Sequence, residues 1–269
     1  MSEPGALPLS DLDLAVASGL VVVAGLVSIA LRLGLVRSLL VAALRTVVQL
    51  ALIGYLLQWV FDLQSAPLVL GWLGVMVFAA SRAAVGRSSR KYPGVHITTL
   101  ITLTVVGLLT TFTVTGAIVH VDPWFDPQYV IPLCGMVLGN SLTGLSLCLD
   151  SLLESFDKGR AEVELRLALG ATAWEASLPA MRAGVRRGMV PILNSMTVVG
   201  IVSLPGMMTG QILAGADPLV AVKYQVVVMF MLAASTSIGS IMIAVMTQRR
   251  LFTPRHQLRS GFISSESIK

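Results

Sequence analysis

Uncharged polar side chains and thioethers inside apolar stretches are the groups in this sequence best placed to contact a solute. Asn140 and Ser141 lie in one such stretch, and the string LPGMMTGQ at 204–211 interrupts another. Its proline and glycines cannot continue an ordinary helix, so irregular backbone there must be buried in protein or line a water-filled cavity. Its thioethers are soft ligands that suit Cu(I) better than iron. These residues do not identify a particular metal. The candidates for lining a translocation path are Arg45, Gln49, Asn140, Ser141, Asn194, Thr197, Pro205, Gly206, Met207, Met208, Thr209, Gln211, Tyr224 and Gln225.

These candidates each have a purely structural alternative. Methionines commonly fill gaps in a core, and small residues such as Gly135 and Gly139 let helices pack closely. Arg45 lies roughly 10 Å from the nearer end of its predicted helix, so its side chain can extend to the lipid headgroups. Tyr224 can act as an anchor at the membrane interface.

A second group of residues lies in the polar segment 150–188. A glycine at 170 is a normal helix stop, and Glu164 precedes it by six residues. Thr172 and Glu175 have the spacing of a capping box, in which each side chain bonds the other residue's backbone N–H. A new helix is therefore predicted to start at Thr172.

On that new helix Trp174, Leu178 and Met181 follow one another at i, i+4 and i+7 and form one apolar stripe. The stripe must be buried somewhere. A coupling helix seated in the groove of a partner protein is one interpretation. The alternative is a helix lying on the lipid surface, with the neighbouring arginines facing the headgroups.

The composition indicates the class of protein in which both groups of residues lie. Of 269 residues 55% are hydrophobic and 12% are charged, and the mean hydropathy is +0.83. Too few polar residues remain to cover a water-soluble globule of this size, which argues against a cytosolic enzyme, a secreted domain or a disordered chain. The net charge of +5 comes from basic clusters between apolar runs, a pattern that sets membrane topology and does not indicate nucleic-acid binding.

The apolar runs predict an all-α, polytopic membrane helix bundle of about seven transmembrane helices. Basic residues lie in alternate connections and in the tail, which places the N-terminus outside and the C-terminus in the cytoplasm. We expect one membrane domain over 1–248, with a cytoplasmic loop at 150–188, and a mobile cytoplasmic tail over 249–269. The predicted spans are 14–31, 38–61, 66–85, 97–119, 129–149, 189–204 and 224–247.

Several strings resemble a known family. The segment ELRLALGATAWEASLP (164–179) resembles the cytoplasmic "EAA" loop of ABC-transporter permeases, in which Glu164 and Gly170 match the usual spacing. IPLCGMVLGNSLTG (131–144), LALGATAWEASLPAMRAGVRRGMVPILNSM (167–196) and GIVSLPGMMTGQILAG (200–215) resemble the FetB-type family more closely. That family comprises bacterial iron-export ABC permeases and plant relatives linked to aluminium tolerance.

The resemblance implies a permease of the bacterial inner membrane that exports a metal ion, with iron as the expected cargo. It implies two partners, a separate ABC ATPase subunit and a second copy of the permease, besides membrane lipid. Coupling to the ATPase would then involve Glu164, Gly170, Thr172, Trp174, Glu175, Leu178 and Met181. The sequence has no Gly-x-x-x-x-Gly-Lys-Ser/Thr segment, so we expect no enzyme activity and no bound cofactor, with ATP used by the partner subunit.

Other cargoes and mechanisms stay open at this stage. No acidic residue lies in the middle of a predicted span, so a bare ferrous ion would meet only weak ligands. The cargo could be a metal chelate or a sugar nucleotide. An ATP-independent secondary transporter would be expected to carry buried acidic residues and an internal repeat, and neither is evident.

Overall fold

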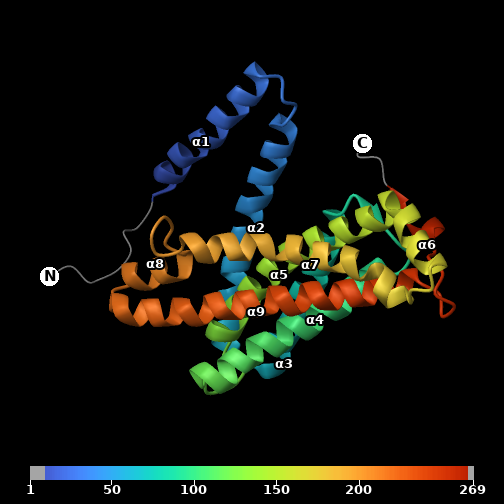
Figure 1. Ribbon diagram of the computed structural model, residues 1–269. Helices are drawn as coiled ribbons and strands as arrows, with labels where there is room; N and C mark the ends of the chain where they lie inside the picture. Colours follow the sequence, from blue (N-terminus) through green and yellow to red (C-terminus); the bar gives the residue numbers. More distant parts are fainter. Residues whose placement is uncertain (1–9, 266–269) are drawn as a thin grey trace. The chain divides into compact units, whose positions relative to one another are not determined.

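The computed structural model describes residues 10–265, which are predominantly α-helical (Figure 1). The described helices are α1 Asp11–Ala30, α2 Val36–Leu63, α3 Ala66–Gly86, α4 Val95–Phe112, α5 Pro127–Lys158, α6 Arg160–Ala168, α7 Ala173–Val198, α8 Gly206–Leu213 and α9 Pro218–Leu251. A π-helix (η1, Thr113–Val119) continues α4, and a 3-10 turn (η2, Ser260–Phe262) lies in the tail. Two short strands, β1 Arg90–Lys91 and β2 Ser264–Ser265, pair antiparallel. The predicted all-α class is therefore confirmed.

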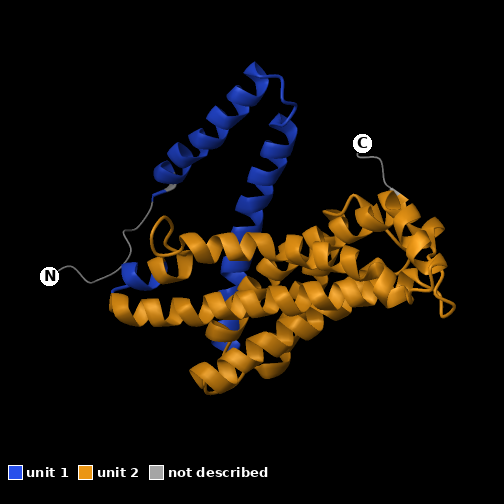
Figure 2. Cartoon of the chain, in the orientation of Figure 1, with its two compact units in different colours: residues 1–64, 210–216 blue, residues 65–209, 217–269 orange. Residues whose placement is uncertain are grey.

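The chain divides into two compact units, which Figure 2 colours separately. Unit 1 comprises residues 1–64 and 210–216, and includes the hairpin of α1 and α2. Unit 2 comprises residues 65–209 and 217–269, and holds the other long helices. The boundary passes through α8. The single membrane domain expected over 1–248 stays a prediction.

Six helices among the described residues are long and apolar enough to cross a membrane: α1, α2, α3, α4 with η1, α5 and α9. The sequence also predicts a span at 189–204, which has no separate helix. Its residues up to Val198 form the apolar end of α7, and the helix begins at Ala173 and carries three arginines. Helix length and composition thus leave the predicted count of seven unconfirmed, because the predicted coupling helix and the predicted sixth span form one element. The orientation stays a prediction.

The core of unit 2 is a crossing of α5, α7 and α9. A Cβ atom added to Gly188 on α7 would lie 2.7 Å from the carbonyl oxygen of Gly144 on α5. At Gly184, one turn earlier, it would lie 3.0 Å from the carbonyl oxygen of Cys148. The helices therefore touch backbone to backbone, and only glycine fits. Of the two glycines expected to serve this purpose, Gly139 does not, since a Cβ there would meet nothing within 4 Å, whereas a Cβ at Gly135 would lie 3.3 Å from Cε of Met76.

The tail after α9 is folded onto unit 2 over its described part, in contrast to the expected mobile tail. Phe252 packs edge-on against Phe156 of α5, with ring centroids 5.7 Å apart. Further along, β2 pairs with β1, where Ser264 faces Lys91. These long-range contacts involve residues far apart in the sequence, which is why local composition suggested mobility.

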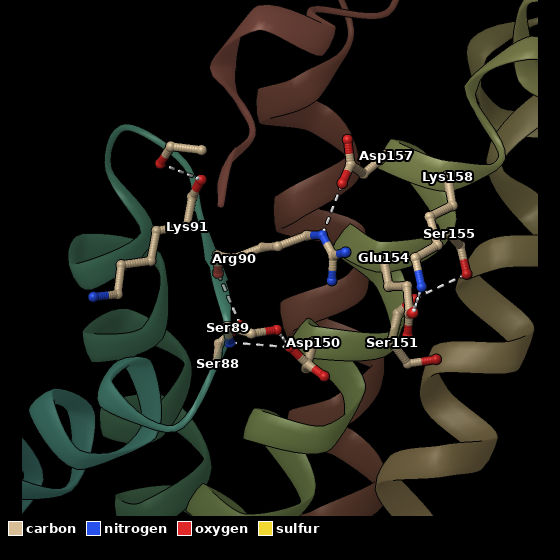
Figure 3. Close-up of polar contacts among 11 residues, drawn as sticks. Ser88, Ser89, Arg90, Lys91, Asp150, Ser151, Glu154, Ser155, Asp157 and Lys158 are labelled. Atoms are coloured by element: carbon tan, nitrogen blue, oxygen red, sulfur yellow. Dashed lines mark hydrogen bonds and ion pairs between the residues drawn. The ribbon is translucent and has the colours of Figure 1, made fainter. Parts of the chain in front are cut away.

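Strand β1 is in turn held against the last turns of α5 (Figure 3). The Asp150 carboxylate accepts hydrogen bonds from the backbone N–H of Ser89, at 3.0 Å, and from its hydroxyl. Arg90 donates to Asp157 at 2.9 Å. We call this end of unit 2, formed by β1, the end of α5, α6, the start of α7 and the tail, the polar end.

Candidate functional site

A cavity of about 270 Å³ lies inside unit 2, between α5, α7, α9 and the start of α8. We call it the thioether cavity, because three of its lining residues are methionines. The lining residues are Met136, Asn140, Ser195, Val199, Ser203, Pro205, Gly206, Met207, Gln225, Val228, Met229 and Leu232. None of these described residues carries a charge.

Helical periodicity explains two walls of the cavity. Met136 and Asn140 lie one turn apart on α5, and the Asn140 amide donates to the Met136 carbonyl at 3.0 Å. Gln225 and Met229 lie one turn apart on α9. Residues at i and i+4 share a helix face, so each polar residue brings a methionine with it.

The third wall is irregular backbone at 199–205. The sequence predicts irregular backbone at 204–211, but from Gly206 onward that segment forms helix α8. After α7 ends at Val198, Gly200 adopts a left-handed φ of +82° and donates its N–H to the Ser203 carbonyl at 2.9 Å. A side chain would strain that conformation. The turn directs Ser203 to the cavity, and α8 then starts at Gly206 and adds Met207.

Gln225 gives the cavity an unsatisfied acceptor. Its side chain is only 6% exposed, and its Oε1 atom has no hydrogen-bond partner in the described protein. Leaving such a group unpaired costs about 1–3 kcal/mol. A cation, or a donor group on a bound solute or water, would relieve that cost.

At the polar end, α6 stops and α7 starts as the sequence predicts. Gly170 has a φ of +95°, and the N–H groups of Gly170 and Ala171 donate to the carbonyls of Leu167 and Arg166, each at 3.0 Å. This is a Schellman motif. Helix α7 then begins behind the predicted capping box of Thr172 and Glu175.

The capping box has an electrostatic consequence. The Glu175 carboxylate accepts from the Thr172 backbone N–H and hydroxyl, both at 2.8 Å. These hydrogen bonds favour the charged form and hold the pKa of Glu175 below its ordinary value. Glu164, by contrast, lies on α6 and pairs with Arg160 at 2.6 Å, a solvent-exposed pair one turn apart.

The apolar stripe of α7 is only partly free. Met181 is buried, Leu178 is half-buried and Trp174 is 48% exposed. The stripe lines one wall of a groove of about 400 Å³, and the opposite wall is formed by Ile241, Ala244 and Val245 of α9. Part of the stripe therefore packs within its own chain, and its start stays open.

His256 is a functional candidate that the sequence analysis does not identify. Its Nδ1 atom accepts a hydrogen bond from the backbone N–H of Ala173, the first residue of α7, at 3.1 Å. Arg255, His256, Gln257 and Leu258 also line a second cavity with Glu164 and Gly170. The partners are 83 residues apart, so no local pattern could reveal them.

The structure brings five of the predicted path residues to the thioether cavity, namely Asn140, Pro205, Gly206, Met207 and Gln225. The others lie elsewhere. Ser141 is fully buried on α5, and Asn194 and Thr197 are exposed on α7; Met208 and Thr209 lie on α8 and Tyr224 on α9, outside the lining. Arg45 and Gln49 are exposed on α2 of unit 1, and Gln211 also belongs to unit 1. Consecutive residues on a helix point in different directions, so neighbouring polar residues in the sequence cannot all face one cavity.

Comparisons with known proteins agree with this architecture. Residues 11–252 match the model of "Uncharacterised protein family (UPF0014)". The chain is 37% identical over 249 residues to the "Probable iron export permease protein FetB" of Escherichia coli, covering 91% of this chain and 93% of that protein. It is 35% identical to the "UPF0014 membrane protein STAR2" of rice, over 93% of this chain and 86% of STAR2. "Protein ALUMINUM SENSITIVE 3" of Arabidopsis thaliana is 32% identical, over 93% and 91% of the two chains. No solved structure matches.

Proposed function

The chain belongs to the UPF0014 family of multi-pass membrane proteins, and on that premise we propose that it is the permease subunit of an ABC transporter that exports a metal ion. A separate ATPase subunit would supply the energy. The name of the Escherichia coli relative supports iron as cargo. The same family includes plant proteins named for other properties, so a metal chelate or a sugar nucleotide remains the alternative cargo.

The start of α7 is the observation that carries this proposal. It presents a half-exposed tryptophan at the open end of an apolar groove, next to a helix start that is fixed by its cap. An apolar anchor beside a groove is a typical docking element for a partner protein. We therefore assign the residues from Gly170 to Met181 to contact with the ATPase.

The exposed polar residues of α5 and α7 support assembly of two copies. Asn140 and Asn194 are exposed in unit 2, and an amide is costly to leave facing lipid hydrocarbon. A second copy packed on this face would enclose them in a polar path. We propose a working assembly of two permease chains and two ATPase subunits.

The mechanism we propose uses α7 as a continuous connection, with Pro179 and Pro191 inside it. The helix is continuous from Ala173 to Val198, about 39 Å at 1.5 Å per residue. Closure of the ATPase pair on ATP would push the start of α7, and the helix would tilt about its glycine crossing with α5. Its far end borders the thioether cavity, so the push would change access to the cargo.

Co-purification with the ATPase tests the proposal. Trp174→Asp and Glu164→Ala should abolish ATP-driven transport and ATPase co-purification while the protein remains inserted. Trp174→Phe should keep both. The matched control is Trp124→Asp in the segment between η1 and α5, where the tryptophan is 51% exposed, and it should keep the ATPase bound.

Two results would overturn the proposal. One is normal co-purification and transport in both Trp174→Asp and Glu164→Ala. The other is solute movement by the reconstituted protein alone, without nucleotide hydrolysis in the vesicle, which would favour a secondary transporter.

A further inference from the structure

We propose that the thioether cavity is a binding site for a soft monovalent cation, Cu(I) or Ag(I), in preference to Fe(II). The proposal rests on the metal-exporting permease proposed above and names a soft cation, in place of iron, as the metal that this cavity holds. It rests on the donor atoms that the fold gathers from three helices and one turn.

The first argument is the set of sulfur donors. Met136 comes from α5, Met207 from α8 and Met229 from α9, and all three line one cavity. Met207 and Met208 are adjacent in the sequence, but only Met207 lines the cavity, together with the distant Met136 and Met229. Thioether sulfur selects Cu(I) over the harder first-row divalent cations.

The second argument is the unsatisfied amide. Gln225 Oε1 is buried without a partner and lies one turn from Met229 on the cavity wall. Asn140 lies one turn from Met136 on the opposite helix. Neutral amide oxygens complete a coordination shell without adding charge, so they suit a cation that the sulfurs already hold.

The third argument is charge. The described lining has no carboxylate and no imidazole, which are the groups that Fe(II) prefers. The desolvation penalty of an ion rises with the square of its charge, so an uncharged cavity discriminates against a divalent cation. A soft monovalent cation has a smaller desolvation penalty and gains the sulfur ligands.

Ag(I) is the probe, because it is soft, monovalent and stable in air. The purified full-length protein in detergent is titrated with Ag(I) by calorimetry, and bound silver is counted after dialysis. The cavity variant changes Met136, Met207 and Met229 to leucine, which conserves volume. The matched control changes Met189, Met196 and Met231 to leucine; these pack nearby and do not line the cavity. Both cysteines are buried and present in every variant.

We expect wild type and control to bind Ag(I) at a site that the cavity variant loses, with affinity lower by about tenfold or more. Fe(II) titrated anaerobically should bind wild type more weakly than Ag(I) does. Gln225→Glu places a carboxylate in the cavity and should raise the affinity for Fe(II) by about tenfold.

Equal Ag(I) binding by the cavity and control variants would overturn the inference, as would tighter binding of Fe(II) than of Ag(I) to wild type. A wild type that binds no Ag(I), so that only water fills the cavity, would also overturn it. None of these results bears on ATPase co-purification, which tests the proposed function separately.

Discussion

The start of α7 is fixed from two sides, whereas its end at Val198 leads into irregular backbone beside a cavity. The capping box of Thr172 and Glu175 and the hydrogen bond from Ala173 to His256 hold the start. At the other end Ile201 is 89% exposed and the turn is closed by a few backbone hydrogen bonds. One helix thus joins a well-anchored segment to a loosely held one.

The largest effect is expected at the glycine crossing of α7 with α5, which lies between the two ends of α7. Gly188→Ala would place a Cβ 2.7 Å from the Gly144 carbonyl oxygen, which cannot move without shifting α5. Overpacking of this kind costs about 1–3 kcal/mol, so the melting temperature should fall by several degrees or more. Gly139→Ala is the control on α5, where a Cβ meets nothing within 4 Å. Equal melting temperatures in the two variants would show that the crossing does not hold α7.

The loosely held end can be tested by filling its cavity. Ser195→Phe inserts a ring into a space of about 270 Å³ and should reduce transport by about tenfold or more, because the cargo and the ring compete for volume. ATPase co-purification should be unaffected, since the start of α7 is far along the helix. Leu193→Phe on an exposed face of the same turn should transport normally. Equal transport by both variants would show that the cargo path does not include the cavity.

The anchored end can be loosened at His256. His256→Ala removes the acceptor of the Ala173 N–H, at a cost of about 1 kcal/mol. Amide hydrogen exchange at 173–175 should become faster by about fivefold, with the cavity end unchanged. His96→Ala, at an exposed position on α4, serves as the control. Unchanged exchange in the His256 variant would mean that the cap alone secures this end.

The smallest effect is expected from pH at Glu175. Its pKa is below the ordinary value in the folded chain because of the Thr172 hydrogen bonds, so its cap contributes fully above the ordinary pKa of about 4.5. That contribution should be lost as the pH falls through the lowered pKa. Exchange at the start of α7 should therefore accelerate as the pH falls below about 4.5, after correction for intrinsic rates. Glu175→Gln should remove this dependence, and a Gln variant with the same pH profile would contradict the assignment.

The sequence predicts local features of the molecule well and long-range ones poorly. Gly170, Thr172 and Glu175 form the stop and the cap that their spacing indicates, because both motifs depend on residues within one turn. The irregular backbone, by contrast, lies at 199–205, mostly before the predicted segment 204–211, which is helical from Gly206 onward.

The cavity itself was predicted only in part. Asn140 and Gln225 are polar residues in apolar runs and could be identified, and helical periodicity would have added Met136 and Met229. The close contact of Gly144 with Gly188 depends on how two helices cross, which no single-helix pattern specifies. The same holds for His256, whose partner lies on another element.

The pairing of the tail with β1 and its hydrogen bond to α7 impose an order on biogenesis. Residues 252–265 leave the ribosome after helices α1 to α9, yet they complete the polar end that those helices begin. A nascent chain would therefore form its long helices first and complete the polar end last.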